Sequence, residues 1–201
     1  MNEPGFFQSM LISVLISVIA ENLVFSRAFG ISPMIAAAKN KRTLPGVCAG
    51  VLYFTAAGSI AMWGVSRFPF TAEQDRHYFV ALYALIIGSI YLVTLLCAFL
   101  FFRSRFPKFK KYVHISAFNS AVMGTIFLSA SGCETFGEYL LFGLTAGLGF
   151  AAASYMLSGV YAQLYSDDVP GAFRGYPAVM IFSGIMAMAV YGILGHAPAY
   201  I

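Results

Sequence analysis

The sequence predicts an all-α integral membrane protein, with six transmembrane helices arranged as a 3+3 inverted repeat. Of the 201 residues, 60% are hydrophobic and 10% are charged, whereas an ordinary soluble domain carries about 25% charged residues. Apolar stretches of roughly 20 residues, the length that crosses a bilayer as a helix, recur along almost the whole chain. Two of them contain polar interruptions in corresponding places, which is the pattern of an inverted repeat.

The predicted spans form one transmembrane domain, residues 1–201, with repeat halves of about 1–105 and 106–201. They lie at about residues 8–38, 46–66, 78–102, 113–131, 139–162 and 177–195. The first ten residues contain no Lys or Arg, and no small-residue cleavage site follows the apolar run, so we expect the first span to be retained rather than removed as a signal peptide.

The first and fourth spans are predicted to be broken helices. The first contains SRAFGISP, in which Gly30 and Pro33 would interrupt the helical hydrogen-bond ladder. The fourth, VHISAFNSAVMGTIFLSAS, is interrupted by Asn119, Ser120 and Gly124. Irregular backbone at membrane depth is tolerated only where protein or a cavity satisfies its polar groups. We therefore expect the two breaks to meet near the membrane midplane.

The residues expected to face each other at these breaks are Ser32, Pro33, Asn119 and Ser120, and the predicted midplane site consists of Gly30, Ser32, Asn119 and Ser120. One interpretation is a small polar site for a cofactor, an ion or a chain of waters at the ends of the half-helices. The alternative is that these small residues only let the helices approach closely.

Glu21 and Asn22 place polarity inside the first span. An ionisable group within a membrane span costs several kcal/mol unless it is paired or hydrated, so a pathway for ions or protons is one interpretation. The other is that the two residues cap the broken helix or bind a partner subunit.

The basic residues predict the orientation of the chain. The loops KNKRTLPG and RSRFPKFKK are strongly basic, whereas SGCETFGE carries only Glu134 and Glu138. We expect the protein to lie in the cytoplasmic (inner) membrane. Placing the basic loops in the cytoplasm then puts both termini on the outer side of that membrane. Because the basic residues lie in short loops rather than on one soluble face, we expect a lipid bilayer and no nucleic acid as their partner.

The three cysteines predict neither a disulfide framework nor a metal site. Cys48, Cys97 and Cys133 are widely spaced and no Cys-x-x-Cys motif is present. We expect buried, unreactive thiols and no metal ligands.

Four stretches resemble the membrane subunits of the Rnf and Nqr respiratory complexes, most closely the RnfA/NqrE type. They are AENLVFSRAFGISPM, RFPKFKKYVHISAFNSAVMG, FGLTAGLGFAAASYMLSGV and YSDDVPGAFRGYPAVMIFSGIMAMAVYGILG. The resemblance implies a six-helix inverted-repeat subunit that pairs with a homologous RnfE/NqrD-type subunit, or with a second copy of itself, beside other redox subunits. In that family the pair holds a [2Fe-2S] cluster, and the complex couples electron flow to Na⁺ or H⁺ movement.

The sequence departs from this family at the two cluster cysteines. The family motifs L-G-x-C and N-C-A correspond here to Gly30-Ile31-Ser32 and Asn119-Ser120-Ala121, so Ser32 and Ser120 occupy the ligand positions. A serine hydroxyl is hard and protonated at neutral pH, which makes it a poor ligand for iron–sulfur clusters. The sequence therefore leaves the identity of the cofactor open, and a flavin supplied by a partner is one alternative. The two serines are either natural divergence, which we favour, or deliberate substitutions of the two cysteines.

We therefore expect a membrane subunit of an Rnf/Nqr-like, ion-translocating electron-transfer complex, which either relays electrons or scaffolds the membrane part and is not catalytic alone. The alternative from another class is a small-ion or solute transporter or channel that uses the same broken-helix site. A purely structural assembly role is the third possibility.

Overall fold

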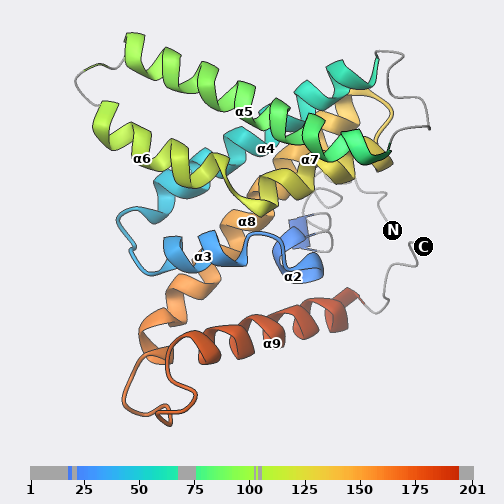
Figure 1. Ribbon diagram of the computed structural model, residues 1–201. Coiled ribbons are helices and arrows are strands. Elements are labelled where there is room, and N and C mark those ends of the chain that lie inside the picture. The colour runs from blue at the N-terminus through green and yellow to red at the C-terminus, as the bar shows by residue number, and fades with distance from the viewer. Residues whose placement is uncertain (1–17, 20–21, 68–75, 102, 104–105, 195–201) are drawn as a thin grey trace, which may run out of the picture.

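The computed structural model describes residues 18–19, 22–67, 76–101, 103 and 106–194, and within these ranges the regular structure is helical. The helices shown in Figure 1 are α2 (Leu23–Arg27), α3 (Ile31–Ala38), α4 (Leu44–Ser66), α5 (Arg76–Phe101), α6 (Phe106–Ala117), α7 (Ser120–Gly132), α8 (Phe136–Leu164) and α9 (Tyr176–Leu194). Glu21 and most of the predicted first span up to that point lie outside the described residues.

The long helices have the properties of membrane spans. Helix α4, residues 80–101 of α5, and α8 are each long and apolar enough to cross a bilayer. Helices α6 and α7 meet the same criteria together, with a bend of 49° between them, and α9 is apolar over the shorter stretch 176–192. The described residues therefore agree with an all-helical membrane protein, and they contain three helices that could span a bilayer, or four if the bent pair counts as one span.

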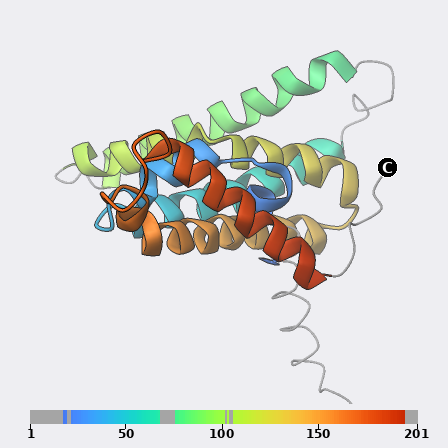
Figure 2. The same ribbon diagram turned by 90° about the horizontal axis from the view of Figure 1, so that it is seen from below.

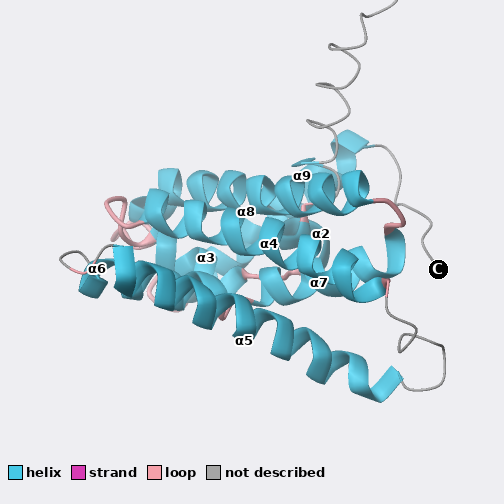
Figure 3. Ribbon diagram, turned by 90° about the horizontal axis from the view of Figure 1, so that it is seen from above, coloured by secondary structure: helices cyan, strands magenta, loops and turns pink. Residues whose placement is uncertain are grey.

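Helices α4 and α8 form the centre of the fold, and the two outermost helices lie on opposite flanks. Figure 1 shows α5 on one side of this pair and α9 on the other, and the view from above in Figure 3 shows the same order. In the view from below (Figure 2), α9 lies in front and crosses over α2 and α3, the two parts of the first broken span. Helix α9 contacts both α2 and α8. The core between these layers includes Phe54, Ile126, Phe150 and Leu157, which are at most 1% exposed.

Glycines on α8 allow it to lie directly against α4. A Cβ atom on Gly147 would be 2.6 Å from Leu52 Cα, and one on Gly143 would be 2.8 Å from the Thr55 carbonyl oxygen. Both contacts are to backbone atoms, which cannot rotate away. In lipid no hydrophobic force drives helices together, so their association depends on close van der Waals packing. Small residues such as these glycines permit that packing because they let the two backbones approach each other.

We expect Gly147→Ala to destabilise the protein and Gly159→Ala, on the same helix, to leave it as stable or more so. The new methyl group at position 147 would force α4 and α8 apart, and overpacking of this kind costs about 1–3 kcal/mol. Position 159 is exposed and has no neighbouring atom within 4 Å, so only the better helix propensity of alanine acts there. Thermal unfolding in detergent, followed by size-exclusion chromatography, measures the difference, and equal midpoints for the two variants would contradict this packing.

The loop between α8 and α9 folds back on itself, as its Pro and Gly residues predict. The Gly175 N–H donates to the Leu164 carbonyl at 3.0 Å, and Gly175 has a φ of 85° with the Tyr165 ring against it. Arg174 and Asp167 form an ion pair at 2.8 Å. Because the Asp167 side chain is 99% exposed, this pair contributes little stability, and the backbone bond is what closes the loop.

Candidate functional site at the two helix breaks

The first break lies between α2 and α3. Ala28 and Gly30 adopt left-handed backbone conformations, with φ of 59° and 82°. The N–H groups of Ala28 and Phe29 donate to the carbonyls of Val24 and Leu23 at 3.1 and 3.0 Å. These bonds satisfy carbonyl groups at the end of α2, as an αL cap does, so the chain can turn here without leaving those groups unpaired.

Pro33 does not cause this break. It is the third residue of α3, and the first N–H groups of a helix have no intrahelical acceptor, so a residue without an N–H loses nothing there. The interruption that the sequence attributed jointly to Gly30 and Pro33 is therefore produced by residues 28–30.

The second break separates α6 from α7 at Phe118 and Asn119. The Asn119 Oδ1 atom accepts the Ala121 N–H at 2.9 Å and so caps the start of α7. Gly124, in contrast, lies inside α7, and a Cβ atom there would be 2.6 Å from the Phe29 ring. Gly124 therefore admits a side chain from the first break and does not interrupt its own helix.

The two breaks are joined by a direct hydrogen bond. The Gly30 N–H donates to the Ser120 Oγ atom at 2.8 Å. A Cβ atom on Gly30 would be 2.9 Å from Ala121 Cβ and 3.1 Å from Asn119 Oδ1, so the Gly30 backbone lies directly against the start of α7. The structure thus brings together three of the predicted site residues, Gly30, Asn119 and Ser120. Ser32 lies in the first turn of α3, and both it and Ser120 are exposed.

The site is electrostatically positive in character. Helices α3 and α7 both begin at the breaks, and the N-terminus of a helix carries roughly half a positive elementary charge. Asn119 is only 3% exposed, and its buried Nδ2 group has no hydrogen-bond acceptor. An unpaired buried N–H is costly, so this arrangement favours an electron-rich group or water as a neighbour.

Asn22 holds the first broken segment against α8. Its Oδ1 atom accepts the N–H groups of Val24 and Phe25 at 3.0 and 3.4 Å, which caps α2. Its Nδ2 group donates to the Gly149 carbonyl at 2.9 Å. A Cβ atom on Gly149 would be 3.2 Å from that Nδ2 atom, so the glycine leaves room for the amide. The capping contact is one of the alternatives to an ion or proton pathway that the sequence left open, whereas the bond to α8 within the same chain was not predicted.

The residues at the breaks do not fit an iron–sulfur cluster. Within the described ranges, no group of three or more His, Cys, Asp or Glu side chains could hold a metal ion. Cys133 follows the last residue of α7, whose 13 residues separate it from Ser120 by about 20 Å. Cys48 is buried within α4, and Cys97 is exposed on α5. Neither Ser32 nor Ser120 supplies a soft thiolate.

Several residues that build the site were not predicted. Ala28 carries no sequence signal for a left-handed conformation, because alanine rarely adopts one. The contact of Phe29 with Gly124 depends on how two distant segments pack. The capping roles of Asn22 and Asn119 did have a signal, since asparagine directly before a helix is a preferred N-cap.

Comparison with known proteins agrees with the resemblance seen in the motifs. The family described as "Rnf-Nqr subunit, membrane protein" matches residues 10–196. Similar proteins include the A subunit of the Na(+)-translocating ferredoxin:NAD(+) oxidoreductase complex of Acetobacterium woodii, 27% identical over 92% of this chain and 97% of that protein. The A subunits of the ion-translocating oxidoreductase complexes of Erwinia tasmaniensis (24% identical; 89% and 93%) and Syntrophotalea carbinolica (22%; 95% and 99%) are also similar. The chain belongs to the Rnf-Nqr family of membrane subunits.

Proposed function

We propose that this chain is a membrane subunit of an Rnf-type, ion-translocating electron-transfer complex, and that it scaffolds the midplane site without supplying thiolate ligands to it. The observation that carries the proposal is the Gly30–Ser120 hydrogen bond of 2.8 Å, which joins the two breaks through one of the two positions where the family has cysteine. The names of the relatives, which are the A subunits of such complexes, support the assignment to this class of complex.

We further propose that the chain forms a 3+3 inverted repeat of six spans. In this arrangement the broken pair α2–α3 corresponds to α6–α7, α4 corresponds to α8, and α5 corresponds to α9. Two features support it: the second helix of each broken span begins directly at its break, α3 after Gly30 and α7 after Asn119, and the paired helices lie symmetrically, with α4 and α8 central and α5 and α9 on opposite flanks (Figure 1).

The exposed surface at the breaks is proposed to contact a partner subunit. Ser32 and Ser120 are exposed, and Phe118, two residues before Ser120, is 62% exposed. Polar groups and irregular backbone are not found facing lipid at membrane depth, because nothing there can satisfy them. A homologous RnfE/NqrD-type subunit, or a second copy of this chain, would cover this surface and complete the midplane site.

The proposed location is the cytoplasmic membrane, with both termini outside. The exposed basic turn after α3 includes Lys39, Lys41 and Arg42, and the α6 residue Lys111 lines a pocket with Asn40 and Thr43 of the same turn. These basic groups therefore gather at one end of the fold, which the positive-inside rule assigns to the cytoplasm.

Affinity purification through a tag on this chain, in mild detergent and without air, tests the proposal. We expect stoichiometric recovery of a second membrane subunit together with redox subunits, with visible absorption from flavin or iron–sulfur groups that those partners carry. The transporter alternative predicts a colourless preparation of this chain alone, whose ion flux in proteoliposomes falls with Glu21→Gln. That second outcome would replace the proposed function.

A further inference from the structure

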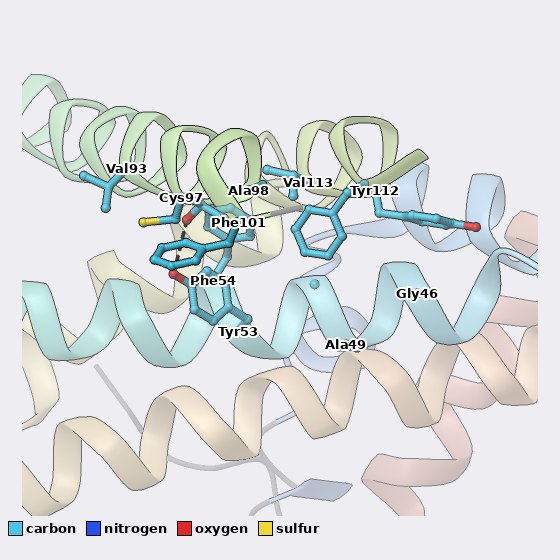
Figure 4. A pocket seen from close by; sticks show the side chains of 13 residues that line it. Gly46, Ala49, Tyr53, Phe54, Val93, Cys97, Ala98, Phe101, Tyr112 and Val113 are labelled. Atoms are coloured by element: carbon cyan, nitrogen blue, oxygen red, sulfur yellow. Dashed lines mark hydrogen bonds between the residues drawn. The ribbon is translucent and has the colours of Figure 1, made fainter. Parts of the chain in front are cut away.

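A cavity of about 450 Å³ opens between α4, α5 and α6, away from the helix breaks. Figure 4 shows Ala49 and Tyr53 of α4 on one side, and Val93, Cys97 and Ala98 of α5 on the other. This volume lies within the range of sites that bind small molecules, about 300–1,000 Å³. The cavity lies beside the outermost helix α5, many of whose side chains are exposed, so it is accessible from the lipid phase.

The polar groups in this cavity are already used within the protein. The Thr94 hydroxyl donates to the Ile90 carbonyl at 2.7 Å, and the Tyr53 hydroxyl lies 3.1 Å from Thr94 Oγ1. Because each hydroxyl has a single hydrogen, Tyr53 is the donor in that second bond, and neither group retains a hydrogen for a ligand. The Tyr112 hydroxyl points away from the cavity (Figure 4). A ligand with carbonyl groups, such as a quinone or flavin ring, would find no free hydroxyl donor here and only the weakly donating Cys97 thiol, whereas a hydrocarbon chain needs no donor.

The charges beside the cavity favour an anionic head. Phe101 and Phe109 line the cavity, and the nearby Arg103 holds its guanidinium 5.6 Å from the Phe99 ring. Lys110 follows Phe109 directly and is exposed. Helices α4, α5 and α6 contain no Asp or Glu at all. Basic groups next to an apolar pocket between helices are the arrangement that binds anionic lipid headgroups.

We propose that this cavity binds an anionic phospholipid, with one acyl chain between α4 and α5 and the phosphate beside Arg103 and Lys110. The bound chain fills the space beneath α5 and holds that helix against α4. This inference does not depend on the electron-transfer role, because no residue of the helix breaks takes part in it.

The test compares a cavity-filling substitution with the same substitution elsewhere. Ala49→Phe would place a ring in the cavity, whereas Ala189→Phe adds it to an exposed position of α9. The intact complex is reconstituted with equimolar phosphatidylglycerol and phosphatidylcholine, and retained lipid is counted by native mass spectrometry. We expect Ala49→Phe to reduce retained phosphatidylglycerol about tenfold, which equals the loss of roughly two buried methylene groups, and Ala189→Phe to leave it unchanged.

Two further variants guard against misfolding and test the headgroup. Cys97→Phe fills the cavity from α5 and should give the same loss as Ala49→Phe even if α4 does not tolerate the ring. Arg103→Gln should abolish the preference for phosphatidylglycerol over phosphatidylcholine without removing the bound chain. Unchanged retention in both filling variants, with the complex intact by size-exclusion chromatography, would overturn the site. An unchanged preference in Arg103→Gln would overturn the anionic headgroup.

Discussion

Replacing Gly30 by alanine is expected to destabilise the protein by about 2–5 kcal/mol, because one added methyl group meets two separate penalties. The left-handed conformation of Gly30, with φ of 82°, costs an alanine about 1–2 kcal/mol. The added Cβ atom would also lie 2.9 Å from Ala121 Cβ, and overpacking costs about 1–3 kcal/mol. Since native proteins are stable by only about 5–15 kcal/mol, this loss is a large fraction of the total, and we expect a lower thermal midpoint and a lower yield of folded protein.

Gly132→Ala is the matched control for this variant. Gly132 ends α7, is exposed and has no atom within 4 Å of the place where an alanine methyl group would lie, so alanine should be tolerated there. Yield and thermal midpoint by fluorescence-detected size-exclusion chromatography measure both variants. A Gly30→Ala protein with the midpoint of Gly132→Ala would show that the two breaks are not held against each other as described.

The double substitution Ser32→Cys with Ser120→Cys is expected to create a binding site for iron. Thiolates are the soft ligands that iron–sulfur clusters require, and the serine hydroxyls are not. Across the proposed subunit contact, either a homologous partner or a second copy with the same substitutions would bring two more thiolates. After anaerobic treatment with iron and sulfide, we expect about two irons per subunit pair and the signal of a reduced [2Fe-2S] cluster.

The controls for this experiment are the wild type and Ser131→Cys, which adds a thiol at an exposed position of α7 outside the breaks. Neither should acquire the signal. If the double variant remains folded and also binds no iron, the exposed serines do not face a partner across the midplane, and the proposed subunit contact is wrong.

The helices were predictable because their signals are long and local, whereas the site depends on short contacts between distant segments. An apolar run such as that of α4 specifies a span whatever surrounds it. Gly30 was predictable as a break, since glycine readily adopts a positive φ. Ala28 and the position of Phe29 against Gly124 were not, because each is imposed by packing. Pro33 misled the prediction because its effect depends on its place within the helix.

The cavity had no counterpart in the sequence analysis for the same reason. Its lining comes from three helices, and the residues on each are the ordinary apolar and aromatic types of a membrane span. Only the path of α5 relative to α4 and α6 makes these residues surround a space. The hydrogen bond between the Tyr53 and Thr94 hydroxyls, which leaves the cavity without a free hydroxyl donor for a ligand, joins residues 41 positions apart.

The bond between the Asn22 side chain and the Gly149 carbonyl also sets an order for biosynthesis. These residues are 127 positions apart, and ribosomes add about 5–20 residues per second. Asn22 is therefore made about 6 to 25 s before the carbonyl that accepts its amide. Since α2, α3 and α4 all contact α8, the first half of the chain cannot complete its packing until α8 has been synthesised, and the Asn22 amide lacks its acceptor for that whole interval.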